Sequence, residues 1–133
     1  MSPEAATTLP LAPAPAEVLR ALADETRLRA VVLLHGEGEL CVCELTEAIG
    51  VSQPKMSRHL ATLRDSGLVR GRREGFWIHY RLAPELPAWA LAAVNAVCDG
   101  VAEQSPFADD RGRLAAMAER PGERCPTPHG ETP

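Results

Sequence analysis

Apolar residues recur at helical spacing in the segment that follows the Pro- and Ala-rich first 15 residues. The pattern predicts a first helix after Pro15 and a second helix capped by Asp24, a residue type favoured at helix N-termini. The second helix should end at Gly36 or Gly38, because glycine commonly follows the last residue of a helix. The composition of residues 1–15 indicates a disordered N-terminal arm.

Two further helices are predicted close together in the next part of the chain. The sequence ELCVCELTEAIG, residues 39–50, indicates a short helix, and Ser52 is a good N-cap for another. Met56, Leu60 and Leu63 recur at helical intervals behind this cap, so they should face the core. Because the turn between the two helices is short, the pair has the layout of a helix-turn-helix, whose second helix enters the DNA major groove.

The apolar period then changes to two residues, which is typical of a strand. Apolar side chains occupy every second position in residues 76–82, and residues 68–73 should form the hairpin partner, with a turn near Glu74 and Gly75. A basic hairpin directly behind a recognition helix is a wing. The predicted fold class is mainly α with a β-hairpin wing (α+β), a dimeric winged helix-turn-helix.

A last long helix is predicted from Ala88 to about Gln104, and it is apolar almost all round. Such a helix needs cover on two faces, and in a chain this small the second cover should be another subunit. We therefore expect a homodimer, with Cys98 also in the interface. The residues assigned to dimerisation are Trp89, Ala93, Val97 and Val101.

Composition limits the domain organisation and the class of protein. The chain has 133 residues, 45% hydrophobic and 4% aromatic, which suits one domain over residues 16–105 and a partly disordered tail over residues 106–133, with a short helix at 108–119. No apolar run reaches the roughly 20 residues that cross a bilayer, and no basic region of a signal peptide is present. We expect a cytoplasmic protein without a membrane partner and with reduced thiols.

The distribution of charge favours a nucleic-acid partner although the net charge is −4. Seven basic and two acidic residues lie between Ser52 and Arg81, whereas the rest of the chain carries seven basic and 16 acidic residues. A basic segment on an acidic body is the pattern expected of a protein that docks on DNA phosphates with one face.

Several motifs, in order, resemble the ArsR/SmtB family of metal-responsive repressors: ALADETRLR, ELCVCEL, SQPKMSRHL, GFWIHYRL and PAW. The resemblance runs from about Val18 to Val97. It implies a winged-helix homodimer whose recognition helices enter successive major grooves of an imperfect palindrome in double-stranded DNA. The residues it assigns to the groove are Gln53, Lys55, Ser57, Arg58 and His59, although His59 borders the buried face, and those it assigns to the wing are Arg72, Arg73 and His79.

The Cys41-Val42-Cys43 motif lies inside ELCVCEL, where the resemblance places the sensing helix. Thiolates select soft ions, and a helix N-terminus favours the thiolate form by lowering the pKa of a cysteine. Residues i and i+2 of a helix point about 200° apart, because each step turns roughly 100°. Binding of one ion by Cys41 and Cys43 should therefore bend the start of this helix.

The identity of the ion follows from the resemblance rather than from spacing. Arsenic-responsive members resemble this chain most, although the position of their third cysteine is Thr46 here. The implied inducer is trivalent arsenic or antimony, bound by Cys41 and Cys43, with Cys125 or an external donor as the third ligand. Cadmium and lead sensors add cysteines from an N-terminal arm, which has none here, and zinc sensors use histidine on the last helix, which also has none.

Three other functions are alternatives: a redox-sensing repressor, a thiol reductase and an architectural DNA binder. A redox-sensing repressor of the same fold would have to pair other cysteines, because Cys41 and Cys43 are too close for a relaxed disulfide. A thiol reductase would need a CxxC motif beside a βαβ unit, and the sequence has neither, so we do not expect an enzyme. An architectural DNA binder would not need the CxC motif.

Overall fold

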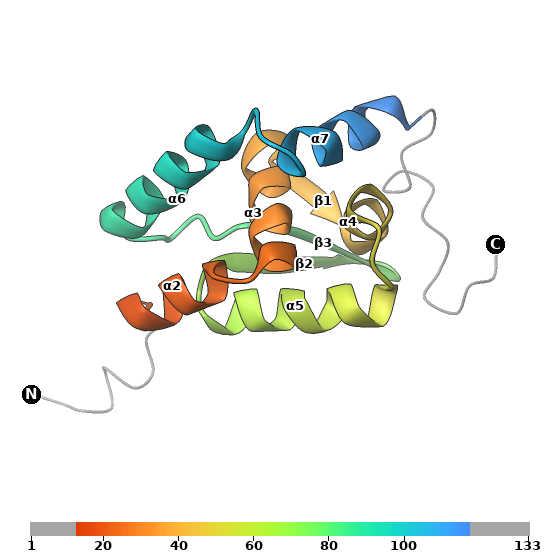
Figure 1. The fold of residues 1–133 in the computed structure, drawn as a ribbon. Coiled ribbons are helices and arrows are strands. Elements are labelled where there is room, and N and C mark those ends of the chain that lie inside the picture. Colours follow the sequence, from red (N-terminus) through yellow and green to blue (C-terminus); the bar gives the residue numbers. More distant parts are fainter. Residues whose placement is uncertain (1–12, 118–133) are drawn as a thin grey trace, which may run out of the picture.

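The computed structural model describes residues 13–117, which form helices around a small antiparallel sheet (Figure 1). The predicted arm up to residue 12 and the predicted tail beyond residue 117, with Cys125, lie outside the described residues. The elements are α2 (Pro15–Leu22), α3 (Glu25–Glu37), β1 (Glu39–Cys41), α4 (Val42–Ile49), α5 (Gln53–Asp65), β2 (Val69–Glu74), β3 (Trp77–Leu82), α6 (Ala88–Val101) and α7 (Phe107–Ala116).

The helix boundaries follow from the predicted capping residues. The Asp24 carboxylate accepts a hydrogen bond from the Arg27 N–H at 3.0 Å, and the Ser52 hydroxyl accepts one from the Lys55 N–H at 3.3 Å. Gly38 ends α3 at φ 95°, a backbone angle that residues with a Cβ rarely adopt. The prediction of both helix starts is thus confirmed.

The core lies around α3, which runs through the middle of the molecule in Figure 1. The predicted inward face of α5 is confirmed, because Met56, Leu60 and Leu63 are fully buried. Five consecutive residues of α3, numbers 30–34, are buried as well, so this helix is covered from several sides. Burial of such side chains contributes about 1.5–3 kcal/mol each and fixes α5 against the rest of the domain.

The predicted hairpin of β2 and β3 is confirmed, and a third strand, β1, joins it in one sheet. The sheet has the order β1-β3-β2, and β3 pairs antiparallel with both neighbours. Gly75 lies in the turn between β2 and β3 at φ 64°. In β1, Glu39 pairs with Arg81 and Cys41 pairs with His79.

The prediction of one helix over residues 39–50 is wrong for its first three residues. Glu39, Leu40 and Cys41 are extended and form hydrogen bonds to the free edge of β3, and the helix begins only at Val42. Cys41 is the N-cap residue, with φ −87° and ψ 167°. Three residues are too few to show a strand period, so the pattern gave no signal for β1.

Helix α6 turns one of its apolar faces to its own domain. Ala90, Val94 and Cys98 are buried, so Cys98 packs in the core of its own chain, and the expectation that it lies in a dimer interface is wrong. Other sides of the helix are open: Trp89 is 42% exposed and Leu91 44%. The position of Cys98 was mispredicted because α6 is apolar on most sides, and its sequence therefore does not indicate which side faces the core.

Helix α7 packs on the same core, through Phe107 and Leu114. The folded unit therefore extends past the boundary expected at residue 105, and α7 covers part of the helix expected at residues 108–119. Over residues 13–117 no helix combines the length and the apolar character needed to cross a membrane.

Candidate nucleic-acid interface and thiol site

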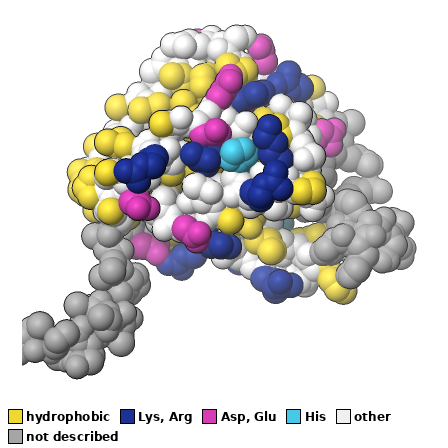
Figure 2. Space-filling model, turned by 60° about the horizontal axis from the view of Figure 1, so that its bottom comes forward, with side chains coloured by type: hydrophobic (Ala, Val, Ile, Leu, Met, Phe, Trp, Pro, Cys, Tyr) yellow, Lys and Arg dark blue, Asp and Glu magenta, His cyan; other side chains and the backbone are white. Residues whose placement is uncertain are grey.

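The recognition helix α5 presents a polar face to solvent. Gln53, Lys55, Ser57 and Arg58 are exposed, in the first turns behind the Ser52 cap. In Figure 2, which turns the α5 side of the molecule forward, Lys and Arg side chains gather over the middle and right, and hydrophobic side chains gather at the left, the end where α2 and α6 lie in Figure 1. The face with α5 thus combines exposed polar side chains with positive charge.

His59 does not belong to this open face. Its side chain is 17% exposed and turns toward the start of α3, where Nδ1 lies 3.3 Å from Arg27 Nη1 and 3.8 Å from the Asp24 carboxylate. Burial lowers the pKa of His59 and the Arg27 charge lowers it further, against the opposing effect of Asp24. The geometry suits a residue that holds α5 against α3 rather than one that reaches into a groove.

The wing side chains assigned from sequence have different surroundings. Arg72 donates to both oxygens of Glu39, at 3.2 and 2.7 Å, and to Glu74 at 3.1 Å. Arg73 is exposed next to the hairpin turn. His79 is turned inward: its Nε2 atom is buried without a hydrogen bond among the described residues and lies 3.7 Å from Glu74.

A hollow of about 380 Å³ lies between the end of α5 and the wing. Arg64, Arg70 and Arg73 line it together with Tyr80 and Glu85, and Glu85 is paired with Arg70. Such a concave basic surface suits a backbone phosphate. Of the three arginines, only Arg73 was singled out from the sequence. The density of basic residues between Ser52 and Arg81 was the available signal for the other two.

Cys41 lies at the junction of β1 and α4 and is 1% exposed. Its backbone N–H donates to the Glu44 carboxylate at 2.9 Å, and the Glu44 N–H faces the Cys41 sulfur, so the two residues cap the helix reciprocally. Burial raises the pKa of the Cys41 thiol, and this effect outweighs the lowering by the Glu44 N–H. The expectation that the helix start lowers the pKa is therefore wrong for Cys41, because desolvation is the larger effect.

Cys43 lies half-buried in the first turn of α4. It is disulfide-bonded in the structure, whereas the sequence predicts reduced thiols. Because Cys41 precedes the helix, the two cysteines do not have the helical separation of about 200° assumed from the sequence. The start of α4 nevertheless carries both thiol positions of the CxC motif.

The described residues do not supply a complete set of metal ligands. Within residues 13–117 no three His, Cys, Asp or Glu side chains are placed to share an ion. The Thr46 hydroxyl donates to the Val42 carbonyl at 2.6 Å, so it serves the helix backbone. Cys125, the fourth cysteine of the chain, lies outside the described residues.

Comparison with known proteins decides the family. A family described as "Bacterial regulatory protein, arsR family" matches residues 24–70, which span α3 to the start of the wing. The arsenic resistance transcriptional regulator ArsR1 of Pseudomonas putida is 52% identical over 107 residues, which cover 80% of this chain and 82% of that protein. The chain belongs to the ArsR family. It is therefore related to DNA-binding transcriptional regulators.

Further relatives agree with this family assignment. The arsenical resistance operon repressor of Escherichia coli is 56% identical over 81 residues, 61% of this chain and 69% of that protein. A solved homodimeric winged helix-turn-helix DNA-binding domain from Mycobacterium bovis is 39% identical, with a TM-score of 0.54 over 63% of this chain and 77% of that one. The ArsR-family fold thus includes the wing that the sequence pattern predicts.

Proposed function

We propose that this ArsR-family protein is a homodimeric repressor that releases its operator when trivalent arsenic binds the thiolates of Cys41 and Cys43. The observation that carries the proposal is the position of both cysteines at the start of α4, the helix that packs directly on the recognition helix α5. The names of the relatives in P. putida and E. coli, both concerned with arsenic resistance, support the choice of ion.

The proposed DNA contacts combine α5 with the wing. Gln53 and Arg58 suit bidentate reading of base edges, whereas Lys55 and Ser57 suit phosphate contacts. Arg72 and Arg73 of the wing, with the arginines of the hollow beside α5, would hold the backbone on either side. In a homodimer two such faces would meet an imperfect palindrome in successive major grooves.

The proposed dimer interface is the open apolar face of α6 together with α2. Trp89 and Val97 are exposed on α6, and Leu19 is 56% exposed on α2. Hydrophobic side chains gather at this end of the molecule (Figure 2), and an exposed apolar patch is a common mark of a protein interface. The homodimeric M. bovis relative supports this assignment.

Binding of the ion would disturb the junction that Cys41 caps. Trivalent arsenic near neutral pH is the uncharged acid As(OH)3. Each thiol that binds it forms one As–S bond and releases one water, without any change of oxidation state. The disulfide at Cys43 has to be reduced first by a thiol. The Cys41 sulfur is buried, so it has to leave its position against the Glu44 N–H, which removes the reciprocal cap of α4.

Loss of this cap can shift the proposed DNA-binding face through two sets of contacts. Helix α4 contacts α5, and β1 contacts β3 of the wing, so both elements of the DNA face are one contact away from Cys41. Antimony in the same oxidation state has the same soft, three-coordinate chemistry and is expected to act likewise. The third donor is either Cys125 or a small thiol or water. We favour the external donor, because docking a Pro-rich tail costs conformational entropy.

A gel-shift series with one operator tests the class of inducer. Reduced protein is bound to the operator, and arsenite, antimonite, cadmium, zinc or peroxide is added. The proposal expects release by arsenite and antimonite at micromolar concentrations and retention with zinc. Release by peroxide alone would contradict it and would support a redox repressor, an alternative favoured by the disulfide at Cys43.

A further inference from the structure

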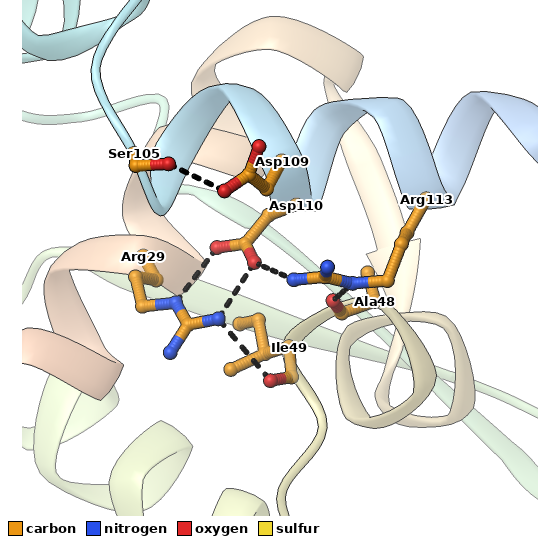
Figure 3. Close-up of polar contacts among 7 residues, drawn as sticks. All are labelled: Arg29, Ala48, Ile49, Ser105, Asp109, Asp110 and Arg113. Atoms are coloured by element: carbon orange, nitrogen blue, oxygen red, sulfur yellow. Dashed lines mark hydrogen bonds and ion pairs between the residues drawn. The ribbon is translucent and has the colours of Figure 1, made fainter.

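Helix α7 carries a buried charge that two arginines share. Asp110 is 1% exposed and accepts two hydrogen bonds from Arg29 of α3, Nε at 2.8 Å and Nη2 at 2.7 Å (Figure 3). Arg113, one turn further along α7, donates to the same carboxylate at 2.6 Å. A buried carboxylate needs such partners, so Asp110 fixes where both guanidinium groups lie.

The same two arginines also bind the end of α4. Arg113 Nε donates to the Ala48 carbonyl at 2.7 Å, and Arg29 Nη2 donates to the Ile49 carbonyl at 3.2 Å. The last carbonyls of a helix have no partner within it, so these bonds satisfy them from outside. Figure 3 shows both guanidinium groups between Asp110 and this end of α4.

The end of α4 matters because the recognition helix follows at once. Only Gly50, Val51 and Ser52 separate α4 from α5, so the position of the last turn of α4 sets where α5 begins. In Figure 1, α7 lies along the top and α5 along the bottom, which places α7 away from the DNA-binding face. An effect of Arg113 on DNA binding would therefore act through α4.

We propose that Asp110 and Arg113 are positioning residues for operator recognition, which hold the last turn of α4 and so set the placement of α5. Together with Arg29 they form the Asp110 clamp. The inference rests on the DNA-binding role of α5 and is independent of the ion that acts as inducer. It assigns a role in DNA recognition to a helix outside residues 24–70, which match the description of the arsR family.

The test compares two arginines of the same helix. Arg113→Gln removes the bonds to Asp110 and Ala48, whereas Arg111→Gln is the matched control, because Arg111 donates to the Ala102 carbonyl and pairs with Glu103. Both variants lose one positive charge from α7, so any general electrostatic effect on DNA binding is the same. Fluorescence anisotropy measures Kd for the operator and for a scrambled duplex without inducer, and thermal unfolding measures the folded fraction.

We expect Arg113→Gln to weaken operator binding at least about fivefold and scrambled-duplex binding less than about twofold, relative to Arg111→Gln. Arg113→Lys should recover part of the loss, because its ammonium reaches one of the two acceptors. Equal operator affinity of the two Gln variants would overturn the proposal, and so would a parallel loss on both duplexes. If Arg113→Gln does not fold, an unchanged operator-to-scrambled ratio in Arg113→Lys would overturn it.

Discussion

Glu39 and Arg72 form a bidentate ion pair that spans the sheet, with Arg72 Nε 3.2 Å and Nη2 2.7 Å from the carboxylate oxygens of Glu39. Glu39 begins the strand that ends at Cys41, and Arg72 lies in the wing. The pair therefore links the proposed thiol site to a side chain that we expect to bind DNA. Without DNA, the Arg72 guanidinium donates hydrogen bonds to two carboxylates, those of Glu39 and Glu74.

Glu39→Gln should strengthen operator binding by about two- to fivefold, because it frees Arg72 for a phosphate and removes only a solvent-exposed ion pair, which contributes little to stability. Anisotropy at low salt measures the change. Glu47→Gln is the control, since it removes the same charge from an exposed position of α4. An equal effect of both substitutions would mean that only net charge matters and that Arg72 has no specific contact.

Arg58→Ala should weaken operator binding, because Arg58 is exposed on the face of α5 that we propose binds DNA. If Arg58 reads a guanine, the loss should be about 1–3 kcal/mol and limited to one base position. If it binds a phosphate, the slope of log K against log salt should fall by about one instead. Arg111→Ala, on the far side of the domain, should change neither quantity, and wild-type behaviour of Arg58→Ala in both assays would remove it from the interface.

Light scattering should give a mass near twice 14.3 kDa for the protein without inducer. Trp89→Glu should convert this dimer to monomers, because it places a charge on the open apolar face of α6, and an acidic residue in the first helical turn does not harm the helix itself. Phe76→Ser removes an apolar side chain from the hairpin turn that is 60% exposed, more than Trp89, and should stay dimeric. A wild-type mass near 14.3 kDa would exclude the proposed dimer.

The pH dependence of operator release should differ between arsenite and cadmium. Burial raises the pKa of Cys41, so its thiol stays protonated at neutral pH. Cadmium has to displace this proton, so its potency should rise with pH, by up to about tenfold per pH unit for each thiol. Arsenous acid carries away the thiol proton as water, so its potency should stay nearly constant between about pH 6.5 and 8. A steep rise with arsenite would contradict this chemistry.

The sequence predicted the elements whose signals are local or periodic. Asp24 and Ser52 marked helix starts, and the spacing of Met56, Leu60 and Leu63 identified the inward face of α5. The strand β1 left no such signal, because three residues show no period and the strand exists only by pairing with β3. Cys98 was assigned to the wrong partner for a related reason, since α6 is apolar on several faces.

The candidate site was predictable in residue type but not in environment. Cys41 and Cys43 were found from their place in the ELCVCEL motif, yet the burial that raises the pKa of Cys41 depends on β3 and the core. The inward turn of His59 and His79 likewise depends on neighbours distant in sequence, Asp24 for the first and the β1 edge for the second. The Asp110 clamp joins residues 81 positions apart, which no local pattern reveals.

The central claim is that arsenic acts through the thiolates of the CxC motif, and one titration tests it most directly. Arsenite is added to the reduced protein bound to its operator, for the wild type and for Cys41→Ser, Cys43→Ser, Cys125→Ser and the core control Cys98→Ala. We predict that Cys41→Ser and Cys43→Ser stay on the DNA, and that Cys98→Ala responds normally. Cys125→Ser should shift the required arsenite less than about tenfold, or 1.4 kcal/mol. A normal response of either Cys41→Ser or Cys43→Ser would contradict the account.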